Sequence, residues 1–175
     1  MNYTEVETLE EYCHFENTSP ETRAMLERLI AVASDQVDQY CGRVFSIATD
    51  AAPVTKVYSS VNGMWNSGGT LWLFDDLQSV YSIPTLVGAP TITYIPDHTP
   101  YYALYRSDGS WEDPTNIIGY WAYSMTPPES IVQAVLRLAS EMVPVPGYTG
   151  DVRRPGRIPE DVKALLDPYR RRQMP

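Results

Sequence analysis

The chain has 175 residues, a length typical of one domain with an appendage rather than of two full domains. Its 13 basic and 22 acidic residues give a net charge of -9, which excludes nucleic-acid binding by bulk electrostatic attraction. No apolar run approaches membrane-spanning length and the first residues are acidic and polar, so we expect neither a transmembrane helix nor a secretory signal. Cys13 and Cys41 form no CxxC pair and favour a reducing compartment; the alternative is a single disulfide between them.

Charge is distributed unevenly along the chain. Residues 1–50 carry a net charge of -7, whereas residues 151–175 carry +3. An acidic first part and a basic last part indicate contact with other copies or with a charged partner. The alternative is that the first part is a solvated helix and the last part a basic tail without a partner. Pro144 to Ile158 is rich in proline and glycine and is therefore predicted to be a linker.

Two helices are predicted before residue 45. The first spans Thr4 to Tyr12 with Thr4 as its N-cap. The second is capped by Ser19, has Pro20 at its first position and ends at Gly42. Its apolar stripe is predicted to be core, together with residues of a later helix: Leu26, Leu29, Ile30, Val37, Ile131, Val135 and Leu138.

The middle of the chain has the pattern of short strands separated by turns. β-Branched and aromatic residues favour an antiparallel sheet or small sandwich. The expected strands are 56–60, 70–74, 79–84, 91–95, 101–105 and 115–123.

Helical periodicity returns at the end. A helix is predicted after Pro127-Pro128, and another opens at Pro159, with Pro168 kinking or shortening it. The expected fold class is α+β: a helical bundle with a β-rich antiparallel insertion and a C-terminal helix on a flexible arm. We expect a body over 1–143 (helices about 4–14, 19–42 and 128–143, insertion about 54–124) and a linker arm with a docking helix over 144–175.

Signals of catalysis are weak. His98 lies in a predicted surface loop without a nucleophile motif, and Cys13-His14 lacks further metal ligands. Asp75 and Asp76 are adjacent and make a poor acid–base pair. We therefore expect no catalytic residue, no cofactor, no metal and no enzymatic activity.

Four segments together match the sequence pattern of one known protein family. The first segment contributes Tyr40, Gly42, Arg43 and Phe45, and Leu71 to Ile83 resembles the family's strand pair. The third segment has Ala122 in place of the usual glycine, and Ile158 to Arg170 resembles the closing helix. The matching residues of the third segment are Gly119, Trp121, Tyr123, Pro127, Pro128, Ile131 and Ala134.

In these four segments the chain resembles the head–tail connector (adaptor or head-completion) proteins of long-tailed bacteriophages. This resemblance implies a structural virion protein at the neck, the head–tail interface, assembled in the host cytoplasm. Such connectors form a homo-oligomeric ring, commonly a dodecamer, below the portal protein. They extend the DNA channel and offer a docking surface to the next neck or tail-terminator protein. DNA would pass through without specific binding, which an acidic chain favours; no membrane is involved.

The hypothesis for docking concerns the C-terminal region. A short amphipathic helix needs a partner for its apolar side, and the basic charge there favours an acidic neighbour, either the portal or an adjacent subunit. The alternative is that this helix packs on its own domain. The predicted docking residues are Arg153, Arg154, Arg157, Val162, Leu165, Leu166, Tyr169 and Arg170.

A second class of function remains open at this stage. Aromatic-rich β proteins bind sugars by stacking, so the chain could be a carbohydrate-binding module or a small hydrolase. The sugar-binding face would consist of Trp65, Trp72, Tyr101, Tyr102 and Trp111.

Overall fold

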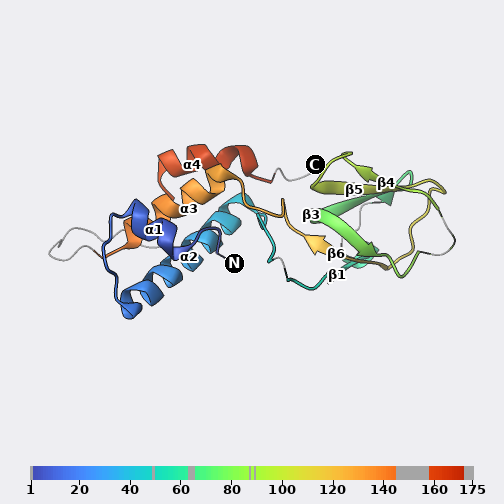
Figure 1. The fold of residues 1–175 in the computed structure, drawn as a ribbon. Helices are drawn as coiled ribbons and strands as arrows, with labels where there is room; N and C mark the ends of the chain where they lie inside the picture. Colours follow the sequence, from blue (N-terminus) through green and yellow to red (C-terminus); the bar gives the residue numbers. More distant parts are fainter. Residues whose placement is uncertain are drawn as a thin grey trace. The chain divides into compact units, whose positions relative to one another are not determined.

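A computed structural model describes residues 2–48, 50–62, 66–86, 88, 90–144 and 158–171. The chain forms two compact units (Figure 1). The helical unit comprises Met1–Phe45 and Pro127–Pro175, and the sheet unit comprises Ser46–Thr126. An α+β fold is therefore confirmed. The last helix belongs to the helical unit, whereas we expected it in a separate arm; residues 145–157 of that arm lie outside the described part.

The described residues of the helical unit form four α-helices. They are α1 (Val6–Tyr12), α2 (Pro20–Cys41), α3 (Glu129–Met142) and α4 (Glu160–Leu166), with a 3-10 turn, η2 (Asp167–Tyr169), after α4. The helix α3 packs against the other three, and α4 also contacts α2. Pro168 in η2 agrees with the expected shortening of the last helix.

The ends of α2 follow the local sequence. The Ser19 hydroxyl accepts a hydrogen bond from the backbone N–H of Thr22 at 3.3 Å. Gly42 ends the helix at φ 66°, a conformation that favours glycine. Both predictions are confirmed. The predicted cap of α1 is wrong: the helix begins at Val6 after Glu5, because Tyr3 is buried and its backbone N–H is bonded to Ser34 of α2.

The predicted helical core is confirmed except at one position. Leu26, Ile30 and Val37 are fully buried, as are Ile131 and Val135, and Leu138 is 4% exposed. Leu29 is only partly buried because it lies at the margin of the apolar stripe of α2.

A six-stranded antiparallel sheet forms the second unit. Its strands are β1 (Val54–Tyr58), β2 (Asn66–Ser67), β3 (Thr70–Ser82), β4 (Ile92–Ile95), β5 (Tyr101–Arg106) and β6 (Thr115–Trp121), and a 3-10 turn, η1 (Ser60–Asn62), follows β1. The order across the sheet is β1-β6-β3-β5-β4, with β2 paired to the start of β3. The edges of this path are therefore β1 and β4.

The strand β3 corrects one expectation. We predicted two strands, over 70–74 and 79–84, but the structure has one strand of 13 residues. Its register is irregular between Trp72 and Leu77, and both Asp76 and Leu77 are buried there. This bulge re-aims the strand, so that its first part pairs with β5 and its second part with β6. Asp75 and Asp76 thus lie inside a strand.

Large side chains fill the core of the sheet unit. This core comprises Tyr58, Leu71, Leu73, Leu77, Leu104, Trp111, Ile117 and Trp121. Gly119 of β6 packs tightly against β3. A Cβ atom added at Gly119 would come within 2.6 Å of the Ser79 carbonyl oxygen and 2.9 Å of a Leu77 methyl. The strand pair therefore requires glycine at this position.

We predict that Gly119→Ala lowers the free energy of unfolding of the sheet unit by about 1–3 kcal/mol, because the added methyl forces the backbones of β6 and β3 apart. Urea denaturation followed by tryptophan fluorescence measures the loss. Ser79→Ala, a change at an exposed position of β3, is the control and should cost less than about 0.5 kcal/mol. Equal stability of the two variants would contradict the close contact.

A second pair of variants tests the margin of the helical core. Leu26→Ala should cost about 2–5 kcal/mol, the usual effect of a large-to-small change at a fully buried position. Leu29→Ala should cost clearly less in the isolated chain, because its side chain already contacts solvent. Thermal melting followed by circular dichroism at 222 nm compares them, and a larger loss for Leu29→Ala would contradict the assignment.

Candidate functional site

The apolar side of α4 is covered by its own unit. Val162 and Leu166 are fully buried, and α4 packs on α3 and α2. Arg137 of α3 reaches Asp161 of α4 with 3.1 Å between guanidinium nitrogen and carboxylate oxygen. The structure therefore matches the alternative in which the helix packs on its own domain, and these two residues are unavailable to a partner while α4 is seated.

The turn after α4 is held against the end of α2. The Tyr40 hydroxyl donates a hydrogen bond to the Asp167 carboxylate at 2.7 Å, and this bond raises the pKa of Tyr40. The Arg170 guanidinium lies 5.0 Å from the centre of the Tyr40 ring. The Arg171 backbone N–H donates to the Cys41 carbonyl at 2.8 Å. The last of these bonds satisfies a backbone carbonyl at the C-terminal end of α2.

Aromatic rings continue this contact inward. Phe45 is fully buried and meets the edge of Tyr169 at a centroid distance of 5.8 Å. On its other side it meets Tyr3 at 5.9 Å, also edge to face. We call Tyr3, Tyr40, Phe45, Asp167, Tyr169 and Arg170 the C-terminal clasp. It joins the first and last of the four segments that carry the family resemblance.

The five predicted docking residues that the structure describes have three different environments. Arg153, Arg154 and Arg157 lie outside the described residues. Val162 and Leu166 are buried, whereas Leu165 and Tyr169 are partly buried. Arg170 is exposed beside Tyr40. Docking by this region stays a prediction.

Tyr3 of the clasp forms a titratable pair with Asp38, a residue that sequence reasoning missed. The Tyr3 hydroxyl donates to the Asp38 carboxylate at 2.5 Å and accepts from the Phe45 backbone N–H at 2.9 Å. Burial raises the pKa of Asp38 to about 6 and, together with the bond to Asp38, raises the pKa of Tyr3. The acidic pattern of residues 1–50 showed the carboxylates but not which of them would be buried.

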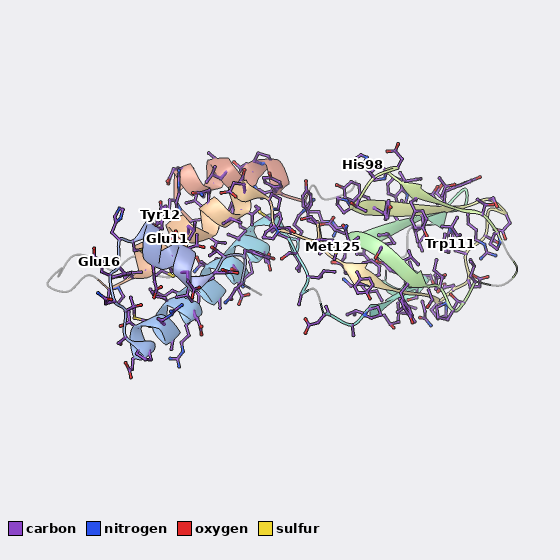
Figure 2. All side chains as sticks on the ribbon, in the orientation of Figure 1. Glu11, Tyr12, Glu16, His98, Trp111 and Met125 are labelled. Atoms are coloured by element: carbon purple, nitrogen blue, oxygen red, sulfur yellow. The ribbon has the colours of Figure 1, made fainter. Side chains whose placement is uncertain are left out.

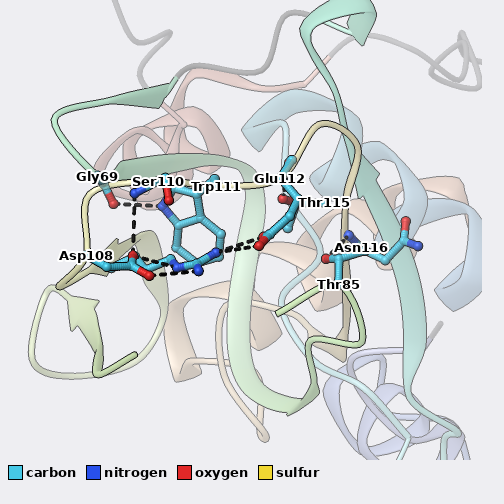
Figure 3. Close-up of polar contacts among 9 residues, drawn as sticks. Gly69, Thr85, Asp108, Ser110, Trp111, Glu112, Thr115 and Asn116 are labelled. Carbon is cyan, nitrogen blue, oxygen red and sulfur yellow. Dashed lines mark hydrogen bonds and ion pairs between the residues drawn. The ribbon is translucent and has the colours of Figure 1, made fainter. Parts of the chain in front are cut away.

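A buried arginine organises the loop between β5 and β6 (Figure 3). Arg106, which is 3% exposed, donates twice to Glu112 at 2.9 and 2.8 Å and once to Asp108 at 2.8 Å. These carboxylates raise the pKa of Arg106, and the arginine lowers the pKa of Asp108. The indole N–H of Trp111 donates to the Gly69 carbonyl at 2.7 Å. All groups here are engaged in holding the loop, which is a structural arrangement.

The proposed sugar-binding face does not assemble. Trp111 is buried under the turn at Gly69, while Trp72, Tyr101 and Tyr102 are partly buried and Trp65 lies outside the described residues. Tyr101 packs on Tyr94 at a centroid distance of 4.8 Å. These rings therefore do not form one exposed stacking platform among the described positions.

The candidate chemical groups are scattered. His98 is exposed (Figure 2), and its Nδ1 lies 3.1 Å from the neighbouring Asp97 carboxylate. Cys13 and Cys41 are free thiols, and burial raises the pKa of Cys41 to about 12. Among the described residues no three potential ligands gather to hold a metal ion, and no described helix has the length and apolarity to cross a membrane.

Comparisons with known proteins found a likeness among solved structures. No protein-family model and no curated protein matches the chain. Among solved structures, the chain is similar to a chain in the neck of an empty GTA (gene transfer agent) particle, computed with C6 symmetry. The two share 14% sequence identity at a TM-score of 0.66, and the match covers 98% of this chain and 91% of the other. The likeness therefore concerns the whole fold.

The buried carboxylate leads to a pH prediction. Between about pH 4 and pH 6 the folded state binds more protons at Asp38 than the unfolded state, so the free energy of unfolding should fall as pH rises through this window. Asp38→Asn keeps an acceptor for the Tyr3 hydroxyl and should remove this pH dependence. The change in the free energy of unfolding that it removes is about 1 kcal/mol across the window, after allowance for solvent screening. Urea denaturation at pH 4, 5, 6 and 7 measures it; identical slopes for both proteins would contradict the raised pKa.

Truncation tests whether α4 stabilises the helical unit. Removing residues 158–175 uncovers α3 and deletes one side of the C-terminal clasp, so the helical unit should melt at a lower temperature, by roughly 5–10 °C. Removing residues 172–175 alone is the control and should leave the melting temperature unchanged. A normal melting temperature after the longer truncation would show that α4 does not stabilise the unit.

Proposed function

We propose that this protein is a structural component of the neck of a phage-type particle, an adaptor that forms a ring at the head–tail interface. The observation that carries the proposal is the fold likeness to a neck chain over almost the full length of both proteins. The ring lies below the portal, extends the DNA channel and presents a surface to the next neck or tail-terminator protein. Its localisation is the virion, after assembly in the host cytoplasm.

Independent support comes from where the resembling residues lie. Gly42 is the left-handed end of α2, Phe45 is the buried ring of the C-terminal clasp, and Gly119 is the close contact between β6 and β3. These residues maintain the fold that the neck chain shares.

The charge of the chain suits a passage for DNA. A net charge of -9 disfavours adhesion of a phosphate backbone, so DNA can pass through a ring of such subunits without being retained. The neck that contains the similar chain was computed with sixfold symmetry, and a twelvefold ring contains a sixfold rotation. We therefore propose a closed ring of six or twelve copies, with twelve as expected from the family resemblance.

The portal is proposed to bind the C-terminal region. The packing of Val162 and Leu166 leaves the basic residues Arg153, Arg154, Arg157 and Arg170 to make the contact, with Leu165 and Tyr169 at its margin. Basic side chains on an otherwise acidic protein favour an acidic surface of the portal.

Binding to heads tests this proposal. The purified protein is mixed with portal-containing heads that lack tails, and bound protein is measured by sedimentation and by electron microscopy of the neck. Wild type should add a ring under the portal. Reversal of Arg153, Arg154 and Arg157 to glutamate should reduce binding at least tenfold, because repulsion replaces attraction. Arg28→Glu, at an exposed position of α2, is the control.

Two results would contradict parts of the proposal. A wild-type protein that neither forms rings nor binds heads would overturn the neck function. Normal binding by the triple reversal variant would overturn the docking role of the basic segment alone. Changing His98 to Ala should leave head binding intact, since this side chain is exposed and paired only locally.

A further inference from the structure

Two open edges bound the strand order of the sheet unit. No described strand pairs with the outer side of β1 or of β4. Both strands are short, five and four residues, and neither contains a proline. An open edge exposes a row of backbone donors and acceptors that can pair with another chain.

Hydrogen bonds to neighbouring strands show which residues face outward at β4. The Arg106 N–H donates to Gly69 on the β3 side of β5, and the Ser107 N–H donates to Thr91 on the β4 side. The backbone N–H and C=O groups of successive residues point to opposite sides of a strand. The backbone groups of Tyr105 therefore also point toward β4, where the partner of Tyr105 in register is Thr93. The backbone groups of Ile92 and Tyr94 therefore face the open side.

The same reasoning applies to β1. The Asn116 N–H donates to the Thr85 hydroxyl on the β3 side of β6. Ile117 therefore faces β1, where its partner in register is Lys56. Thr55 and Val57 are left facing the open side, so each edge offers the backbone groups of two residues to a neighbour.

Charge does not protect either edge. β4 has no charged residue, and its Tyr94 and Ile95 are 36% and 37% exposed. Val54 and Val57 of β1 are 55% and 49% exposed. Lysines often block exposed edges, but Lys56 is drawn inward: it pairs with Asp75 and lies 4.7 Å from the Trp121 ring centre.

We propose that the β4 edge of one copy pairs with the β1 edge of the next copy, so that neighbouring sheet units are joined strand to strand in the ring. This inference rests on the proposed ring. A closed ring requires two different, complementary surfaces on each copy, and one sheet with two unlike open edges of five and four residues supplies them. The occupant of each edge is therefore a second copy of this chain.

Proline substitutions at outward positions test the pairing. Tyr94→Pro removes an outward N–H of β4, and Val57→Pro removes one of β1; an edge strand tolerates proline where the N–H faces solvent. Tyr94→Ala and Val57→Ala are the matched controls, which shorten the side chain but keep the N–H. Thr93→Pro, which removes an inward N–H, should instead unfold the sheet unit. Circular dichroism establishes which variants are folded.

Self-association is measured by analytical ultracentrifugation up to the highest soluble concentration. Wild type and the alanine variants should form closed rings, whereas each folded proline variant should stay a monomer. A mixture of Tyr94→Pro and Val57→Pro should form a two-chain species, because each variant keeps the edge that the other lacks, and the blocked edges prevent further growth.

The outcomes separate the two proposals. Rings formed by a folded proline variant as readily as by wild type would overturn the edge pairing and leave the neck function in place. Dimers of Val57→Pro alone would show that like edges meet, which also overturns it. A wild-type chain that is monomeric at every concentration and adds no ring to portal-containing heads would overturn both.

Discussion

Phe45 is the residue on which the helical unit depends, because its ring is packed between Tyr3 from the start of the chain and Tyr169 from its last described turn. Hydrogen bonds form beside these three rings. Tyr3 bonds Asp38 and the Phe45 backbone, and Tyr169 follows directly on Asp167, which binds Tyr40. Segments more than 120 residues apart are thus held at the carbonyl end of α2. The segment around Gly42, one of those that carry the resemblance, forms the α2 side of this contact.

Local signals predicted the parts of the fold that local chemistry determines. Ser19, Pro20 and Gly42 delimit α2 because capping depends on neighbouring residues alone. The start of α1 could not be predicted in this way, since the burial of Tyr3 against α2 decides it. Likewise, we expected two strands, over 70–74 and 79–84, but the structure has one strand, in which the bulge and the ion pair between Asp75 and Lys56 lie.

The candidate site was less predictable for a related reason. The amphipathic pattern of α4 indicated which side chains needed a partner, and the structure shows that α2 and α3 provide it. A periodic pattern indicates that a face is apolar but does not identify the surface that covers it. The pairing of Arg106 with Asp108 and Glu112 was equally hidden, because nothing in the sequence marks one arginine among 13 basic residues as buried.

The helical unit is discontinuous, and this has a consequence for synthesis on the ribosome. Its first half, through Phe45, emerges before the sheet unit, and its second half emerges after Thr126. The apolar stripe of α2 therefore has no α3 to pack on until the sheet unit has been made, so the sheet unit is free to fold first. During that interval α2 is an exposed apolar surface in a crowded cell. The many carboxylates of residues 1–50 then act as like charges that keep nascent chains apart.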